Sequence, residues 1–259
     1  MRVGVLGAAG RMGTAVCRAV AQDPDLELVA AVDPHHAGLD IKVVTGVEVA
    51  GQVAGEAEAL AAAGAEVAVD FTVADSARAN LRWCARNRVH AVVGTTGLSE
   101  ADLEELGTLF VDGVNCFIAP NFAIGAVLMM RFAEMAAPYF ETAEVVELHH
   151  DEKVDAPSGT AMLTLERMAR ASSDWGVDPT TKEVVPGARG GAGPGGVHVH
   201  SLRLRGVVAH QEVLLGTTGQ TLSIRHDAYD RTSFLPGVVM AIKAVADRPG
   251  VTVGLDVLL

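Results

Sequence analysis

RVGVLGAAGRMG, residues 2–13, joins a short apolar run to a helical pattern through a glycine-rich turn. The run at 2–6 is rich in β-branched valine and is typical of a buried strand. Residues 11–22 place Ala, Val and Met on one face at helical spacing, which predicts a helix. A strand, a glycine turn and a helix in this order begin a βαβ unit.

The same alternation of strand and helix continues through the first half of the chain. Parallel strands need crossover connections, which are right-handed and usually helical. The pattern therefore predicts an α/β fold in which helices cover both faces of a Rossmann-type parallel sheet. The predicted strands are 2–6, 26–32, 65–71, 90–94 and 114–119, and the predicted helices are 11–22, 76–87 and 99–110.

The glycine loop has the strand–loop–helix context of a phosphate-binding turn. Gly7 permits the tight turn, Gly10 permits close approach of a pyrophosphate, and Gly13 permits the helix to pack on the strand. The spacing is G-x-x-G-x-x-G rather than G-x-G-x-x-G, but Asp33 ends the second strand, where an acid accepts ribose hydroxyls. We expect a nicotinamide dinucleotide here, and a glycine turn without a ligand is the alternative. The expected loop contacts are Gly7, Ala8, Ala9, Gly10, Arg11 and Met12.

Two residues bear on the choice between NADH and NADPH. Asp33 favours NADH, because a carboxylate repels the 2′-phosphate of NADPH. Arg11, at the helix start, offers a partner for that phosphate, although a solvated helix residue explains it equally well. We expect use of NADH, NADPH or both.

Small and polar residues also follow the fourth and fifth predicted strands, at the edge where open α/β sheets bind ligands. Gly94, Thr95 and Thr96 offer amides and hydroxyls suited to a nicotinamide carboxamide. Asn121 is also a good N-cap for the next helix, and taken alone it favours that structural role. The other expected cofactor contacts are Ala119, Pro120 and Phe122.

From about residue 123 the pattern changes to a smaller α+β domain with a mostly antiparallel open sheet. Turns at Gly206 and 216–219 suggest that the last three strand-like runs form an antiparallel meander. The apolar parity of the first of these runs shifts between Val199 and Leu202, which suggests a bulge near Ser201. The predicted elements are a helix at 124–140, a strand at 143–150, a helix from residue 158, and strands at 197–205, 207–216 and 220–226.

Residues 231–250 predict a final helix, with Asp230 as its N-cap and Pro249-Gly250 as its stop. The expected dinucleotide-binding domain is therefore 1–122 together with 235–259. The expected substrate-binding and oligomerisation domain is 123–234.

Composition excludes several classes of protein. A net charge of −12 argues against a nucleic-acid partner, whose binders carry basic surfaces. No apolar run approaches the roughly 18 residues of a membrane span. The three cysteines, at positions 17, 84 and 116, have no metal-binding or redox spacing. These features indicate a cytoplasmic protein without a membrane partner.

HHDEKVDAPSGT, residues 149–160, is a dense polar run in an otherwise apolar region. Histidine titrates near neutral pH and serves as a general acid or base. The Pro-Ser-Gly-Thr segment predicts a helix start, where free N–H groups attract anions. No metal site is expected, because adjacent histidines splay apart and the helical H-E-x-x-H spacing is missing.

A further comparison rests on the stretches VGVLGAAGRMG, DFT (70–72), VVGTTG, APNFAIG, ELHHDEKVDAPSGTA (147–161), PGARG and HQEVLLGTTGQTLSIRHDAYDRTSF (210–234). In their order and spacing the chain resembles the 4-hydroxy-tetrahydrodipicolinate reductase family, also called dihydrodipicolinate reductase, over essentially its whole length. The resemblance implies a homotetrameric oxidoreductase of bacterial lysine and diaminopimelate synthesis that uses NADH or NADPH. The implied substrate is a small cyclic imine with two carboxylates.

The resemblance also implies roles for site residues. His149 matches the family's acid–base residue and Lys153 its second proton donor, while His150, Gly159 and Thr160 match substrate-binding positions. If the strand continued through both histidines, their side chains would point to opposite faces, so which one donates the proton stays open. A solvated lysine is the alternative for Lys153. Arg189, in a glycine-rich loop, is either a substrate contact or a surface residue.

Two other functions stay open on the sequence alone. One is another two-domain nicotinamide dehydrogenase acting on an amino-acid-like substrate, although none of the three cysteines lies in a polar loop suited to a thioester nucleophile. The other is a non-catalytic NAD(P)H sensor, which would have no use for His149, Lys153 and the helix start together.

Overall fold

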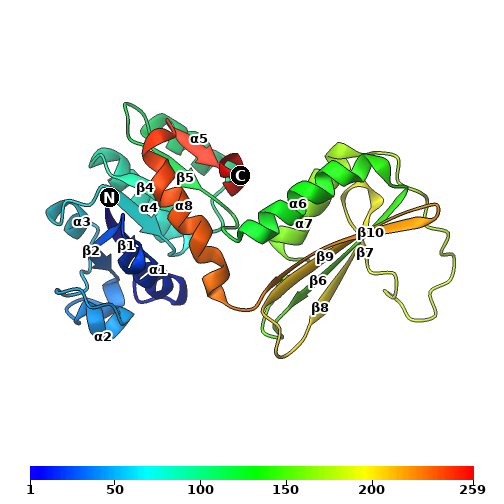
Figure 1. Cartoon of the computed structure of the whole chain (residues 1–259), viewed down its shortest axis with the longest axis horizontal. Coiled ribbons are helices and arrows are strands. Elements are labelled where there is room, and N and C mark those ends of the chain that lie inside the picture. The colour runs from blue at the N-terminus through cyan, green and yellow to red at the C-terminus, as the bar shows by residue number, and fades with distance from the viewer. The chain divides into compact units, whose positions relative to one another are not determined.

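The computed structural model describes residues 1–259 and divides them into two compact units. Unit 1 comprises Met1–Phe122 and Phe234–Leu259, and unit 2 comprises Ala123–Ser233. The chain enters unit 2 after the fifth strand of unit 1 and returns for its last helix, as the colour sequence in Figure 1 shows.

Unit 1 is built on a six-stranded sheet whose paired strands are all parallel, with the order β11-β5-β4-β3-β1-β2. The five predicted strands are present, and the expected Rossmann-type sheet is confirmed. The carboxyl ends of parallel strands meet at one edge, so the residues that follow β1 to β5 gather there. The strands are β1 Arg2–Leu6, β2 Glu27–Val32, β3 Val67–Asp70, β4 His90–Val93, β5 Cys116–Ile118 and β11 Val251–Val253.

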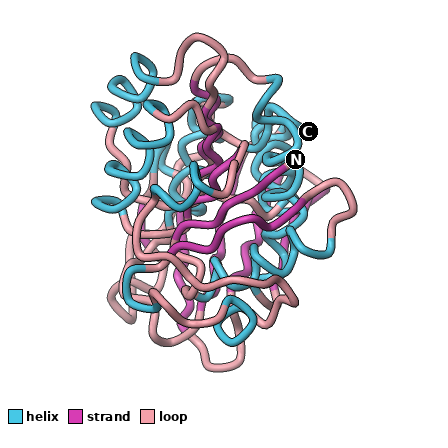
Figure 2. Tube along the Cα trace, turned by 90° about the vertical axis from the view of Figure 1, so that its left-hand side faces the viewer, coloured by secondary structure: helices cyan, strands magenta, loops and turns pink.

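Helices lie outside these strands in the view that faces unit 1 (Figure 2). The helix α5 begins with a capping box. The Ser99 side chain accepts from Asp102 N–H, and the Asp102 carboxylate accepts from Ser99 N–H. The short helices α2 and α3 were not predicted, because five residues are too few to show a helical period. The helices are α1 Arg11–Gln22, α2 Ile41–Thr45, α3 Glu58–Ala62, α4 Ala74–Arg86, α5 Glu100–Leu109 and α8 Leu235–Ala244.

The predicted helix at 231–250 is too long. A 3-10 turn covers Arg231–Phe234, α8 follows, and a second 3-10 turn covers Val245–Asp247. After Gly250, which has a φ of 76°, the chain forms β11 against β5. A three-residue edge strand shows too little periodicity to be predicted.

Unit 2 is a five-stranded mixed sheet, with α6 and α7 packed against it. Figure 1 shows both helices on the same side of the sheet. Buried side chains from β6, β8 and β9, among them Val145, Val199 and Val213, form the core with the helices. The elements are α6 Ile124–Ala136, β6 Thr142–His149, α7 Gly159–Ala171, β7 Gly191–Ala192, β8 His198–Arg203, β9 Ala209–Thr217 and β10 Gln220–Ala228.

The predicted antiparallel meander of the last three strands is wrong in one connection. The hairpin of β9 and β10 is antiparallel as expected, but β6 lies between β8 and β9. Strand β8 pairs parallel to β6, and β9 pairs antiparallel to it. The turn at Gly206 therefore connects β8 to β9 across the end of β6 and does not close a hairpin. Local turn residues do not reveal that a strand from earlier in the chain pairs between these two.

The predicted bulge near Ser201 is also wrong. Residues 144–149 of β6 pair one for one with residues 198–203 of β8, without a shift. The apolar parity breaks because Ser201 and Arg203 follow Val199 on the face that carries Glu147 of β6. Polar residues occupy this face at the end of β8 because Ser201 and Arg203 form hydrogen bonds with the buried carboxylate of Glu147.

Candidate active site

The glycine loop of unit 1 is tightly folded between β1 and α1. Gly7 has a φ of +75°, a left-handed conformation that favours glycine. A Cβ on Gly13 would lie 2.0 Å from the carbonyl oxygen of Gly7, so only glycine lets the helix approach the loop. Gly10 is the N-cap of α1, and no side chain caps the helix there. The helix start therefore presents its N–H groups where a phosphate would bind.

Asp33 directly follows β2 and lies beside this loop. Its Oδ2 accepts from Ala9 N–H at 3.3 Å, while its Oδ1 accepts from His35 N–H at 3.1 Å and lies 2.9 Å from His36 Nδ1. Burial acts to raise the pKa of Asp33, but the bonds from His36, Ala9 and His35 lower it overall. Asp33 is thus a fixed carboxylate that ties the glycine loop to the end of β2. His36 was not predicted, although the His-His pair directly after Asp33-Pro34 was visible in the sequence.

A buried carboxylate also organises the ends of β3 and β4. Asp70 is 1% exposed, and its Oδ1 accepts the hydroxyls of Thr72 and Thr95, each at 2.7 Å. Its Oδ2 accepts from Asn80 Nδ2 at 2.7 Å. Gly94 leaves room for the ring of Phe71, which an added Cβ would meet at 2.0 Å. The hydroxyl of Thr95 therefore donates its hydrogen to Asp70 and not to a ligand.

The other residues expected to bind the cofactor divide by burial. Thr96, Pro120 and Arg11 are exposed at the sheet edge. Ala8 and Ala119 are buried, and their N–H groups donate to Val32 and Val93. The ring of Phe122 lies in the core, 5.9 Å from that of Phe71. A cavity of about 300 Å³ opens at this edge of unit 1, and its lining includes Gly7, Val32, Pro34, Thr72 and Asn80.

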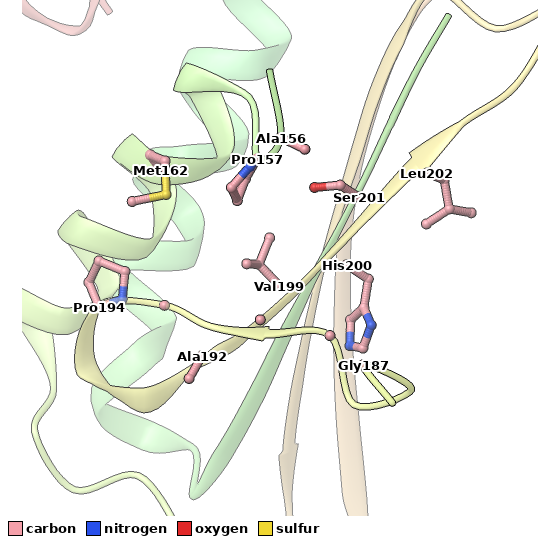
Figure 3. A pocket seen from close by; sticks show the side chains of 13 residues that line it. Ala156, Pro157, Met162, Gly187, Ala192, Pro194, Val199, His200, Ser201 and Leu202 are labelled. Carbon is pink, nitrogen blue, oxygen red and sulfur yellow. The ribbon is translucent and has the colours of Figure 1, made fainter. Parts of the chain in front are cut away.

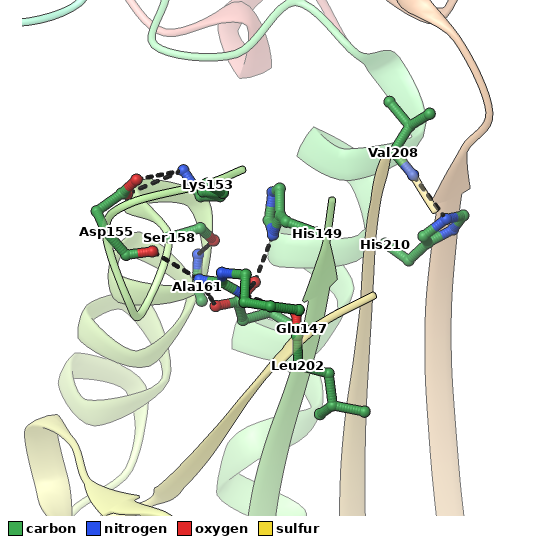
Figure 4. A network of polar contacts seen from close by, with 10 residues as sticks. Glu147, His149, Lys153, Asp155, Ser158, Ala161, Leu202, Val208 and His210 are labelled. Atoms are coloured by element: carbon green, nitrogen blue, oxygen red, sulfur yellow. Dashed lines mark hydrogen bonds and ion pairs between the residues drawn. The ribbon is translucent and has the colours of Figure 1, made fainter. Parts of the chain in front are cut away.

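In unit 2 the strand β6 ends at His149, and the side chain of His149 is 16% exposed. The ring nitrogen Nδ1 contacts Oε2 of Glu147, whose side chain has no exposed surface. Figure 4 shows this nitrogen facing Glu147 and the other ring nitrogen facing away. His150 lies beyond the strand and is exposed. The parity conflict between the two histidines is thereby removed, because the strand ends between them.

Arg203 of β8 completes the support of Glu147. Its Nη2 donates to Glu147 Oε1 at 2.9 Å and its Nη1 to Oε2 at 3.2 Å. Burial acts to raise the pKa of Glu147, but the bonds from His149, Arg203 and Ser201 bring it down to about 2. The carboxylate is therefore ionised although water does not reach it.

The same arginine reaches the segment that carries Lys153. Nη2 of Arg203 donates to the carbonyl oxygen of Asp155 at 2.6 Å. The carboxylate of Asp155 accepts from Lys153 Nζ at 2.7 and 2.9 Å, which lowers the pKa of Asp155 (Figure 4). Lys153 is 20% exposed, so it is not a freely solvated side chain.

The helix α7 begins directly after this segment. Ser158 is its buried N-cap, and its hydroxyl accepts from Ala161 N–H at 3.2 Å. At Gly159 an added Cβ would meet nothing within 4 Å, so the first turn of the helix faces open space there. A helix start in such a place is suited to a carboxylate ligand.

A cavity of about 630 Å³ in unit 2 lies beside this region but is not lined by His149 or Lys153. Figure 3 shows Pro157, Met162, Val199 and Ser201 around it. The guanidinium of Arg189 binds Glu144 at 2.6 Å and Asp178 at 3.1 Å, and these two carboxylates also pair with His200 and His198. His149 and Lys153 form the candidate site, because the hydrogen-bond network of Glu147, Arg203 and Asp155 connects them.

Two groups of this site were missed in the sequence. Glu147 and His149 are two residues apart on a strand and so share a face, a signal present in ELHH. Arg203 was assigned no chemistry, although the loss of apolar parity after Val199 marked it as an inward-facing polar residue.

The three cysteines are fully buried, which raises the pKa of Cys17 and of Cys84 to about 12 and that of Cys116 as well. None of them is a nucleophile at neutral pH.

A glycine loop between a parallel strand and a helix is typical of dinucleotide-binding domains. Together with a second unit that carries a carboxylate-supported histidine and a lysine before a helix start, it is what a two-domain oxidoreductase of the nicotinamide-dependent class requires. Comparison with known proteins gives the family. Residues 1–122 match the profile of the N-terminal part of dihydrodipicolinate reductase, and residues 125–259 match that of its C-terminal part.

Relatives match the chain over its full length. It is 49% identical to the 4-hydroxy-tetrahydrodipicolinate reductase of Cutibacterium acnes, with 100% of this chain and 98% of the relative covered. It is 50% identical to that of Nocardia farcinica, with 99% and 97% covered. The dipicolinate-bound dihydrodipicolinate reductase from Paenisporosarcina sp. TG-14 superimposes with a TM-score of 0.87 at 38% identity, covering 100% of this chain and 99% of the other.

The chain therefore belongs to the dihydrodipicolinate reductase family and is a 4-hydroxy-tetrahydrodipicolinate reductase of lysine biosynthesis. Membership implies a nicotinamide cofactor. An amine dehydrogenase from Mycobacterium smegmatis, with a TM-score of 0.65 at 16% identity, shares the fold alone. No helix of the structure is long and apolar enough to cross a membrane.

Proposed function

We propose that unit 1 binds NADH or NADPH and that His149 and Lys153 of unit 2 are the proton donors of the reduction. One observation carries the proposal: Arg203 connects the support of His149, through Glu147, with the segment that holds Lys153. Two proton donors are thus fixed by one network beside a helix start. A solvated lysine and a satisfied core histidine would not share such a network.

The cofactor fits the residues at the carboxyl edge of unit 1. The uncapped start of α1 receives the pyrophosphate, and the cavity beside Gly7 and Val32 receives the adenosine. Oδ2 of Asp33 accepts one long bond from Ala9, so it retains capacity for a ribose hydroxyl. Arg11, exposed at the helix start, is the partner for the 2′-phosphate of NADPH, which supports use of both cofactors.

Substrate binding follows from charge. The substrate is a cyclic dicarboxylate, and the dipicolinate bound to the Paenisporosarcina relative has the same two carboxylates on a ring. One carboxylate binds at Gly159 and Thr160, where the dipole of α7 favours an anion. Lys153 and His150 meet the other. These groups make a local cationic site in a protein of net charge −12.

The chemistry needs a hydride and a proton. When bound, the reduced nicotinamide supplies the hydride, with its two electrons, to a ring carbon conjugated with the imine. His149 gives a proton from Nε2 to the neighbouring carbon, and the imidazole then regains a proton from water. Lys153 neutralises the carboxylate beside it and is the second donor for this same proton. The dehydrated ring thus gains one hydride and one proton, and a ring that still carries the 4-hydroxyl group also loses that group as water.

We also propose that the chain acts in the cytoplasm as a homotetramer. Its three cysteines are free thiols, which supports a reducing compartment. The sheet of unit 2 has helices on one side (Figure 1), and an antiparallel-rich sheet with half-exposed leucine on its other face supports assembly through that face.

The proposal is tested by following the loss of nicotinamide absorbance with freshly made cyclic substrate, for the native chain and for Lys153→Ala. We expect turnover by the native chain, and for the variant a fall in kcat of about 10²-fold or more with unchanged cofactor affinity. A variant that loses cofactor binding would show that Lys153 is structural. Turnover that survives in the variant would remove Lys153 from the chemistry.

A further inference from the structure

Glu147 is a charged side chain without exposed surface, placed two residues before the end of β6. Burying an ionised carboxylate is unfavourable unless close partners satisfy it. Its partners come from two strands, with His149 on β6 and Arg203 on β8. Packing alone would favour an apolar residue here, as it does at Val145 on the same face. The presence of a carboxylate calls for a functional reason.

We propose that Glu147 is a positioning residue that fixes the tautomer and the orientation of His149, and that Arg203 is the positioning residue for Glu147. The inference rests on the proposed function, which assigns proton transfer to His149. It concerns residues that act through His149 and do not themselves touch the substrate.

The geometry explains how Glu147 acts. A neutral imidazole carries its hydrogen on one nitrogen only, and an ionised carboxylate accepts but cannot donate. Glu147 contacts Nδ1, so the hydrogen resides on Nδ1 and Nε2 is left to pick up and release a proton. Figure 4 shows the free nitrogen facing away from the carboxylate. Without Glu147 the ring is free to rotate and to carry its hydrogen on either nitrogen.

Arg203 has two functions in this arrangement. Its two bonds to Glu147 keep the carboxylate in one orientation, a fork geometry that a lysine does not reproduce. Its bond to the carbonyl oxygen of Asp155 fixes the segment that carries Lys153 to the same arginine that supports His149 through Glu147. Loss of Arg203 therefore disturbs both proton donors, whereas loss of Glu147 disturbs His149 first.

The test combines kinetics with the ¹⁵N NMR spectrum of His149 in the full-length protein. In the native chain we expect the Nδ1–H tautomer of neutral His149. In Glu147→Gln we expect a mixture of tautomers, and a kcat lowered about 10²- to 10³-fold while KM for the cyclic substrate changes by less than about threefold. A purely structural glutamate would lower the melting temperature and leave the kcat of the folded fraction and the tautomer unchanged.

Conservative variants separate charge from geometry. Glu147→Asp keeps the carboxylate and should recover part of the kcat lost in Glu147→Gln. Arg203→Lys should lie between the native chain and Arg203→Met, because it keeps the charge without the fork. If Glu147→Gln does not fold, these variants and the tautomer of the native chain decide. An Nε2–H tautomer in the native protein overturns the inference.

Glu212→Gln is the matched control. Glu212 is an ion-paired glutamate of the same sheet, 3.2 Å from Arg225, and it is registered with Val146, so it faces away from Glu147. Its kcat and the His149 tautomer should equal those of the native chain. No turnover by the native chain would contradict the proposed function itself. Native turnover together with a fully active Glu147→Gln would contradict only the role of Glu147.

Discussion

Glu147 shows how a charge is kept in a place that water does not reach. His149 and Arg203 occupy both of its oxygens, and burial alone would have driven the carboxyl group to its neutral form. The arrangement stabilises the folded chain and, in our proposal, also orients His149 for proton transfer. If that proposal holds, the stability of the protein and its chemistry depend on the same contacts.

The stability of the protein should therefore depend on pH through Glu147. Burial opposes ionisation, yet the hydrogen bonds lower the pKa of this carboxyl from 4.5 to about 2. Its contribution, on the order of 3 kcal/mol, is complete above pH 4.5 and is lost as the pH falls from there through about 2. We expect the difference in unfolding free energy between the native chain and Glu147→Gln to shrink over this range.

Denaturant unfolding at a series of pH values measures this difference, and the same series with Glu212→Gln controls for the loss of a glutamate elsewhere in the sheet. A difference that stays constant down to about pH 2 would mean that Glu147 is not held ionised in the folded state.

Among single residues, the sequence predicted the roles of those that the backbone conformation or a strand end requires. Gly7 and Gly13 stand where a positive φ and a close approach require glycine, and Asp33 ends a strand, so local pattern was enough. Glu147 and Arg203 depend on each other across 56 positions, and a strand pattern does not say which strand lies beside it. His149 was identified through the family resemblance, and its support came from the structure.

At the scale of elements, the start of α1 is the part of unit 1 on which the proposed cofactor site depends most. Its closeness to the loop is set by Gly13, whose added Cβ would lie 2.0 Å from the carbonyl oxygen and 2.7 Å from the carbonyl carbon of Gly7. Both atoms belong to the backbone and cannot rotate aside. The helix would have to move away from the loop.

Gly13→Ala should therefore destabilise unit 1 by about 1–3 kcal/mol and raise the Kd of NADH and NADPH about tenfold or more. Gly107→Ala, on the exposed side of α5 where an added Cβ meets nothing within 4 Å, is the control and should stabilise by about 0.5–1 kcal/mol. Urea unfolding and cofactor titration measure the two effects. Normal cofactor affinity in Gly13→Ala would place the dinucleotide away from this helix start.

Helices and strands were predicted well where the apolar periodicity is strong. They were predicted poorly where the structure depends on which strands pair with each other. The five parallel strands each read as a buried apolar run between turn residues. Strands β8 and β9 were placed side by side because Gly206 lies between them, but β6 is the strand to which both of them bond. The short strand β11 forms only because β5 offers it an edge.

For the whole molecule, the exposed face of the unit 2 sheet predicts an assembly. Leu214 of β9 is 37% exposed, while its neighbours Val213 and Leu215 are buried against the helices. Strand alternation puts Leu214 on the opposite face, with Val146 and Leu202. Covering this face with the same face of other copies would bury these side chains.

We expect light scattering to give a mass four times the 26.9 kDa of one chain. Leu214→Glu should reduce this mass, because it places a charge inside the contact. Val43→Glu, on an exposed valine of unit 1, should leave it unchanged. A native chain with the mass of a single copy would contradict assembly through this sheet.

The central claim is that a cyclic dicarboxylate is held between the start of α7 and His149. A crystal structure of the protein with dipicolinate tests it most directly. We predict one carboxylate on the N–H groups of Gly159 and Thr160, and the ring about 3–3.5 Å from Nε2 of His149, with Nδ1 still on Glu147. Dipicolinate bound away from His149, or a His149 ring turned away from Glu147 in the complex, would contradict the claim.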